Sequence, residues 1–262
     1  MARQEPKSSG NLVETVFETV SVHANIPVLL THQRFLAAGV LLVLLSGFFA
    51  SIGYGQSDHP ISGRRIAPVM GVGGAQWLER SEREIEEMPE TALNEIGIKP
   101  GMVVGDIGTG VGYFAIRIAS RVGPEGKVYA EDVQPEMLTM LRSRARRAGV
   151  ANIIPILGTE SDPRLPAKTF DLLLMVDVYH EFSQPQKMLR KLREALKDDG
   201  RLVLLEYRKE DPAIPIRPEH KMSVEEAKLE VEAEGYQLER VSEALPRQHI
   251  LIFKKTESTP KS

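Results

Sequence analysis

Short apolar runs alternate with amphipathic stretches from residue 75 to residue 255. The runs have the length of strands, and residues 170–178 are too apolar for a strand with one solvated face, which indicates that both faces are covered. The predicted strands occupy residues 102–107, 127–133, 152–157, 170–178, 201–207, 236–245 and 249–255. The last two are predicted to form an antiparallel pair.

Amphipathic stretches with an apolar residue every three or four positions separate most of these runs and predict helices. They occupy residues 112–122, 135–148, 183–197 and 223–235, and shorter helices are predicted before residue 99. The residue pairs with the spacing of N-terminal helix caps are Ser81 with Glu84, Ser183 with Gln186, and Ser223 with Glu226. The charged residues over 223–234 are predicted to form a solvated helix face. Strands and helices in this order predict an α/β fold, Rossmann-like, with a mostly parallel sheet and helices on both faces.

An uncharged segment precedes this regular region. Residues 35–57 are apolar and long enough to cross a bilayer as a helix. Small residues and glycines follow the apolar core, as they do in a secretory signal, so a transmembrane anchor and a signal-like segment are alternatives. We predict a mobile tail over 1–34, a linker over 58–74, a domain over 75–255 and a C-terminal tail over 256–262.

The composition removes several classes of site. The 262 residues include no cysteine, which excludes disulfides, thiolate zinc sites and iron–sulfur clusters. The formal net charge of −3 gives no support to nucleic-acid binding. The six histidines are scattered without ligand spacing, so no metal site is expected.

A glycine-rich loop over 105–112 follows the first predicted strand of the domain. Its glycines allow the backbone to approach a ligand closely. The dinucleotide pattern G-x-G-x-x-G begins at Gly108 and fails at its sixth position, Tyr113. Asp106, just before the glycines, would repel a pyrophosphate and attract an ammonium group. Asp132 at the end of the next strand suits the hydroxyls of a ribose, so the two acids together favour an adenosine with a cationic amino-acid tail.

The segments VVGDIGTGVGYFAIRIA and GKVYAEDVQPEML resemble the class I S-adenosylmethionine-dependent methyltransferases. The similarity is closest to the small-molecule group that includes the ubiquinone/menaquinone-type enzymes, and it covers about residues 76–255. The resemblance implies a seven-stranded sheet whose last strand is antiparallel. It also implies S-adenosylmethionine as the cofactor.

The same resemblance assigns residues to the cofactor. Asp106, Gly108 and Gly110 are expected along its methionine half, Asp132 at the ribose and Val133 against the adenine. The full set of expected cofactor-binding residues is Asp106, Gly108, Thr109, Gly110, Gly112, Asp132, Val133 and Glu160.

One family feature is altered in this chain. Family members often place an acid directly after a glycine in the loop near the adenine amino group, whereas Thr159 follows Gly158 here. Glu160 or Asp162 is expected to take that role.

The loop over 177–182 lies where the family places the methyl donor and acceptor. His180 is predicted as a general base near neutral pH, with Glu181 or Asp177 orienting it. The alternative is that His180 only caps a strand end, because a base is needed only when the acceptor must lose a proton. Tyr179 is predicted to pack on the cofactor or touch the acceptor.

Other candidates lie at the same rim of the predicted sheet. Glu206 and Tyr207 end the fifth strand and are a second candidate pair. Trp77, the only tryptophan, is predicted to belong either to a lid over the site or to a helix on the domain edge.

The resulting hypothesis is a methyltransferase that acts on a small or lipid-soluble acceptor and is attached to a membrane through its N-terminal span. Arg64 and Arg65 after the span, against Arg34 before it, favour a cytoplasmic catalytic domain; export after signal cleavage is the alternative. The rival functions are an NAD-type oxidoreductase and a non-catalytic binding module with the same fold.

Overall fold

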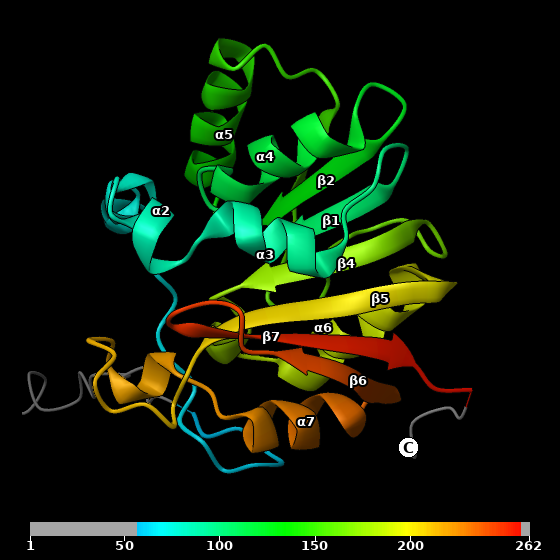
Figure 1. Cartoon of the computed structure of the whole chain (residues 1–262). Helices are drawn as coiled ribbons and strands as arrows, with labels where there is room; N and C mark the ends of the chain where they lie inside the picture. The colour runs from blue at the N-terminus through cyan, green and yellow to red at the C-terminus, as the bar shows by residue number, and fades with distance from the viewer. Residues whose placement is uncertain (1–56, 258–262) are drawn as a thin grey trace, which may run out of the picture. The chain divides into compact units, whose positions relative to one another are not determined.

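The computed structural model of the chain describes residues 57–257, which form one seven-stranded sheet (Figure 1). The strands lie in the order β3-β2-β1-β4-β5-β7-β6, and in the described residues β7 alone runs opposite to the other strands. The mixed sheet and its terminal antiparallel pair are therefore confirmed. The strands are β1 (Val103–Ile107), β2 (Lys127–Asp132), β3 (Ile153–Leu157), β4 (Phe170–Val176), β5 (Leu196–Tyr207), β6 (Tyr236–Ser242) and β7 (Gln248–Lys255).

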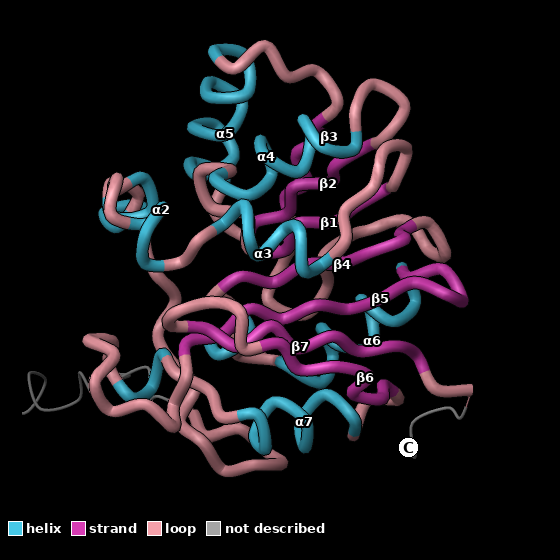
Figure 2. The backbone as a smooth tube through the Cα atoms, in the orientation of Figure 1, coloured by secondary structure: helices cyan, strands magenta, loops and turns pink. Residues whose placement is uncertain are grey.

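Helices cover both faces of the sheet (Figure 2). One apolar core includes side chains of α3, α4 and α5, and the other includes side chains of α6 and α7. The helices are α2 (Arg83–Glu86), α3 (Pro89–Ile96), α4 (Tyr113–Val122), α5 (Pro135–Arg147), α6 (Pro185–Ala195) and α7 (Val224–Glu232). Short 3₁₀ turns complete the described part: η2 (Val72–Gly74), η3 (Trp77–Glu79), η4 (Tyr179–Glu181) and η5 (Pro218–His220).

The apolar run of strand β4 from Leu172 to Val176 follows from its place in the sheet. Leu172 and Leu174 belong to the core on one face of the sheet, and Leu173 and Met175 belong to the core on the other. Side chains alternate across a strand, so a strand with helices on both faces needs apolar residues at every position. The prediction of a strand covered on both faces is confirmed.

Of the three predicted N-terminal helix caps, one is present in the structure. Ser223 forms the expected capping box with Glu226, whereas the caps predicted at Ser81 and Ser183 are wrong. Helix α2 begins only at Arg83, and α6 begins at Pro185, which suits the first helical position. The Ser183 hydroxyl donates instead to Glu160, at 2.8 Å.

The segment predicted as a linker over 58–74 is attached to the domain. The Arg64 guanidinium is buried and donates to both carboxylate oxygens of Glu230 at 2.8 and 3.1 Å. It also donates to the backbone carbonyl of His180, at 3.0 Å. The prediction that the charges over 223–234 face solvent is wrong at Glu230, which is fully buried because Arg64 and His59 are its partners.

The apolar segment 35–57 lies outside the described residues except for its last one. Within residues 57–257, no helix is long and apolar enough to span a membrane.

The ion pair of Arg64 with Glu230 provides a test of how the segment 58–74, the N-terminal segment of the described residues, is held against the domain. Arg64→Ala is expected to lower the free energy of unfolding by about 3–5 kcal/mol, because it leaves the Glu230 carboxylate buried without its bidentate partner. Urea unfolding measures this loss. Lys191→Ala is the control, since its pair with Glu194 is solvent-exposed, and its urea midpoint should barely change. Equal midpoints for the two variants would contradict the buried pair.

Candidate active site

A cavity of about 900 Å³, part of which is open to solvent, lies at the carboxyl ends of β1, β2 and β4. Ligands on parallel sheets bind at this edge, where the strand order reverses, here between β1 and β4. The glycine-rich loop, the end of β2 with the loop after it, the loop after β4 and the segment before α3 supply most of its lining. Met137, Glu160 and Met188 supply the rest.

The glycine-rich loop has a backbone that other residues would not adopt easily. Gly108 has φ +65°, and a Cβ there would overlap the Val178 side chain. Gly112 precedes α4 with φ +81°, and a Cβ there would overlap Leu141. Gly108 and Gly110 line the cavity as expected, whereas Gly112 acts at the helix start. The loop therefore presents bare backbone to the cavity.

The Asp132 carboxylate joins two loops of the site. It accepts hydrogen bonds from the backbone N–H of Gly110 and of Gln134, both at 2.8 Å. Asp132 also lines the cavity. Burial raises the pKa of its carboxyl. Val133 follows it at the cavity wall, and its side chain is part-exposed.

Glu131, beside Asp132, is a cavity residue that the sequence analysis missed. Its side chain is buried, and its Oε1 atom has no hydrogen-bond partner. Desolvation and the neighbouring Asp132 raise the pKa of this carboxyl to about 8. A Cβ at Gly158 would overlap the Glu131 carboxylate, which explains the glycine there. The only sequence signal was an acid at an inward position of a predicted strand.

Asp106 and Thr109 of the glycine-rich loop line a smaller adjoining pocket. The Thr109 hydroxyl donates to Asp106 at 2.6 Å. Burial raises the pKa of the Asp106 carboxyl to about 6. Both residues belong to the site, but neither lines the main cavity.

Acids from the later loops line the opposite wall. Asp177 and Glu160 reach the cavity, and Glu181 lies beside them. Asp177 has φ +52°, is held by a bond from the Gln248 side-chain amide at 2.7 Å, and keeps Oδ1 without a partner. Burial, together with Glu87, raises its pKa well above the usual range.

His180 and Tyr179 are buried and do not line the cavity. The Nδ1 atom of His180 contacts Glu206 Oε2 at 2.6 Å, and its Nε2 contacts His220 Nδ1 at 3.1 Å. Tyr179 packs under Arg64, whose guanidinium lies 5.5 Å from the ring centre. Their predicted contact with the acceptor stays a prediction.

The other lining side chains are mostly apolar. Met70, Trp77, Phe182 and Met188 are among them, so Trp77 does reach the cavity. Arg83 is the one cationic side chain among the described lining residues, and its Nε donates to Glu87 at 2.6 Å. No sequence pattern points to Arg83, because it lies on a short helix before the first strand.

Comparisons with known proteins agree with this geometry. A family model described as a methyltransferase domain matches residues 98–251. A ubiquinone/menaquinone biosynthesis C-methyltransferase UbiE of Cupriavidus taiwanensis is 29% identical over 117 residues, which are 45% of this chain and 48% of that protein. The chain thus spans about half the length of the curated relatives it matches.

The matches to solved structures cover more of this chain than the matches to curated relatives do. A SAM-dependent methyltransferase from Aquifex aeolicus is 31% identical, with a TM-score of 0.67, and the match covers 71% of this chain and 98% of that one. The cyclase SpnF shares the fold with a TM-score of 0.55 at 14% identity, over 65% of this chain and 81% of that one. Fold alone therefore does not fix the reaction.

The sheet order and the acid-preceded glycine loop are those of the class I S-adenosylmethionine-dependent methyltransferases. The family model covers more than half of the sequence, and this chain belongs to the methyltransferase domain family.

The residues present fit S-adenosylmethionine. The cavity is lined by five carboxylic acids and one arginine, which suits a ligand with a sulfonium and an ammonium group. The bare backbone at Gly108 and the unpartnered Oε1 of Glu131 are further features of a ligand site.

The raised pKa values of the Asp106 and Glu131 carboxyls predict how cofactor affinity depends on pH. A cationic ligand favours the ionised forms of Asp106 and Glu131, whose pKa values are raised to about 6 and about 8. Binding should release protons, so affinity should rise between about pH 6 and pH 7.5. Calorimetry in two buffers of different ionisation enthalpy measures the release.

Glu131→Gln is the matched variant, since it keeps the side-chain shape and removes the titration. Its affinity should rise less steeply with pH, and S-adenosylhomocysteine, which lacks the sulfonium charge, should also release fewer protons. A slope in Glu131→Gln as steep as in the parent protein would contradict this assignment.

Proposed function

We propose that the protein transfers the methyl group of S-adenosylmethionine to a small, largely apolar or lipid-soluble acceptor. The observation that carries the proposal is the mixed lining of the cavity. Five carboxylic acids line it, and Met70, Trp77, Phe182 and Met188 add a large apolar surface. An apolar wall favours a flat or chain-like acceptor over a highly charged one.

This chain supplies specific groups to hold the cofactor. Asp132 would accept hydrogen bonds from the ribose hydroxyls and Val133 would pack on the adenine, while Gly108 and Gly110 would offer backbone to the methionine half; all four line the cavity. Arg83 is the cation available for the carboxylate of that half. When bound, S-adenosylmethionine supplies an electrophilic methyl group.

The acceptor has to be aligned with the methyl group in a site that excludes water. Alignment and desolvation supply much of the acceleration in such a displacement. The unpartnered Oδ1 of Asp177 is the cavity group best placed to accept a proton or hydrogen bond from an acceptor that needs one. A direct base role for His180 would require its ring to turn away from Glu206 and His220.

The UbiE relative, named for C-methylation in ubiquinone and menaquinone biosynthesis, supports a quinone-like ring as one acceptor to test first.

We propose further that residues 35–57 anchor the protein in a membrane, with the catalytic domain on the cytoplasmic side, where S-adenosylmethionine is made. Protease added to intact spheroplasts should leave the domain undigested, and its digestion from outside would refute this orientation.

Asp132→Asn tests cofactor binding and methyl transfer together. S-Adenosylmethionine should raise the melting temperature of the parent protein, and the variant should lose this shift because its amide cannot accept as a carboxylate does. The exposed Asp198→Asn is the control and should keep the shift.

Incubation with methyl-labelled S-adenosylmethionine and a membrane lipid extract then reports the acceptor. We expect labelled product in the apolar fraction with the parent protein and with Asp198→Asn, and none with Asp132→Asn. Cofactor binding without any labelled small molecule would refute the proposed transfer.

A further inference from the structure

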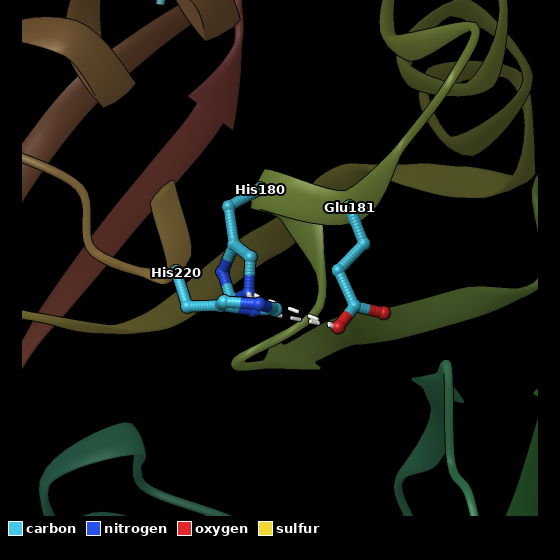
Figure 3. Close-up of side chains that lie close together, drawn as sticks. All are labelled: His180, Glu181 and His220. Atoms are coloured by element: carbon cyan, nitrogen blue, oxygen red, sulfur yellow. Dashed lines mark hydrogen bonds and ion pairs between the residues drawn. The ribbon is translucent and has the colours of Figure 1, made fainter. Parts of the chain in front are cut away.

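Two histidines and a glutamate converge at the wall of the cofactor cavity (Figure 3). His180 and Glu181 lie on η4, directly after β4, and His220 lies on η5, 40 residues further along the chain. The fold brings these turns together, which is why the sequence showed no ligand spacing.

The three donor atoms have the dimensions of a metal site. His180 Nε2 lies 3.1 Å from His220 Nδ1, and Glu181 Oε1 lies 3.9 and 3.8 Å from these two nitrogens. The point equidistant from three atoms with these separations lies about 2.1 Å from each of them, which is the metal–ligand distance of zinc with nitrogen and oxygen donors.

Glu206 fixes which nitrogen of His180 is free to bind. Its buried carboxylate contacts Nδ1 at 2.6 Å, so the proton of the neutral ring resides there and Nε2 keeps its lone pair toward Glu181 and His220. A carboxylate behind a histidine is the usual outer support of a metal-ligating imidazole. Buried Glu206 therefore has the position that a metal site requires.

Glu181 is also held in place. The backbone N–H of Met70 lies 3.3 Å from both of its carboxylate oxygens, and Arg64 donates to the carbonyl of His180 from the same N-terminal segment. The donor set is thus supported from two distant parts of the chain, the segment that contains Arg64 and Met70, and strand β5.

His249 provides a contrast within the same protein. Its Nδ1 contacts Glu243 at 2.7 Å and its Nε2 contacts Glu210 at 2.9 Å, so both ring nitrogens already have carboxylate partners. Within residues 57–257, His249 is not part of a donor group that could hold an ion. At His180 and His220, by contrast, two nitrogens face each other and share one carboxylate oxygen.

We propose that His180, His220 and Glu181 bind a divalent transition-metal ion, with Zn²⁺ the ion that the donors fit best. Two imidazoles and one carboxylate suit zinc and leave its fourth position open. Because Glu181 also lines the cavity, the ion would join η4 and η5 at the cavity wall. The proposal does not depend on methyl transfer, since binding is measured without cofactor or acceptor.

The test uses the full-length, untagged protein stripped with a chelator. Calorimetric titration with Zn²⁺ should give one saturable site that His220→Ala and Glu181→Gln each weaken at least tenfold. Co²⁺ should give the visible absorption bands of a four-coordinate nitrogen and oxygen site. His249→Ala is the matched control and should bind as the parent protein does.

Glu206→Gln tests the outer support without touching the ion and should weaken Zn²⁺ binding about 10–100-fold. Circular dichroism and the melting temperature of each variant without metal separate lost folding from lost binding. The proposal is overturned if no stoichiometric site is found, if folded His220→Ala binds as tightly as the parent, or if His249→Ala loses as much affinity.

Discussion

The contact on which the site depends is the Asp132 carboxylate between two backbone N–H groups. By accepting from Gly110 and Gln134, it joins the glycine-rich loop after β1 to the start of α5 after β2. The exposed backbone at Gly108 and the close packing of Gly112 on Leu141 require that these two loops keep their relative positions. A ligand that meets Asp132 therefore meets a carboxylate whose position is already determined by the fold.

The second constraint is electrostatic. The parallel strands end at one rim and bring Asp106, Glu131, Asp132 and Asp177 into low-dielectric surroundings, where burial raises each pKa. Such a group of acids opposes its own ionisation unless a cation is present. The same arrangement that is unfavourable in the free protein therefore favours a sulfonium cofactor.

Local patterns predicted what is local in this fold. The strands, the Ser223 cap and the acids at the ends of β1 and β2 follow from residues close together in sequence. Arg83 could not be assigned to the cavity, nor Glu230 to the interior, because their surroundings come from distant segments. His220 was not predicted as a metal ligand for the same reason, since no spacing rule relates residues on separate loops.

The N-terminal segment connects these observations. Arg64 reaches the carbonyl of His180, and Met70 both lines the cavity and donates to Glu181. Any displacement of this segment would remove one wall of the cavity and the support of the loop after β4 at the same time. Because buried Glu230 needs Arg64 as its partner, that displacement carries a large electrostatic cost. The segment before β1 is thus an integral part of the site, and the ion pair of Arg64 with Glu230 holds this segment against the domain.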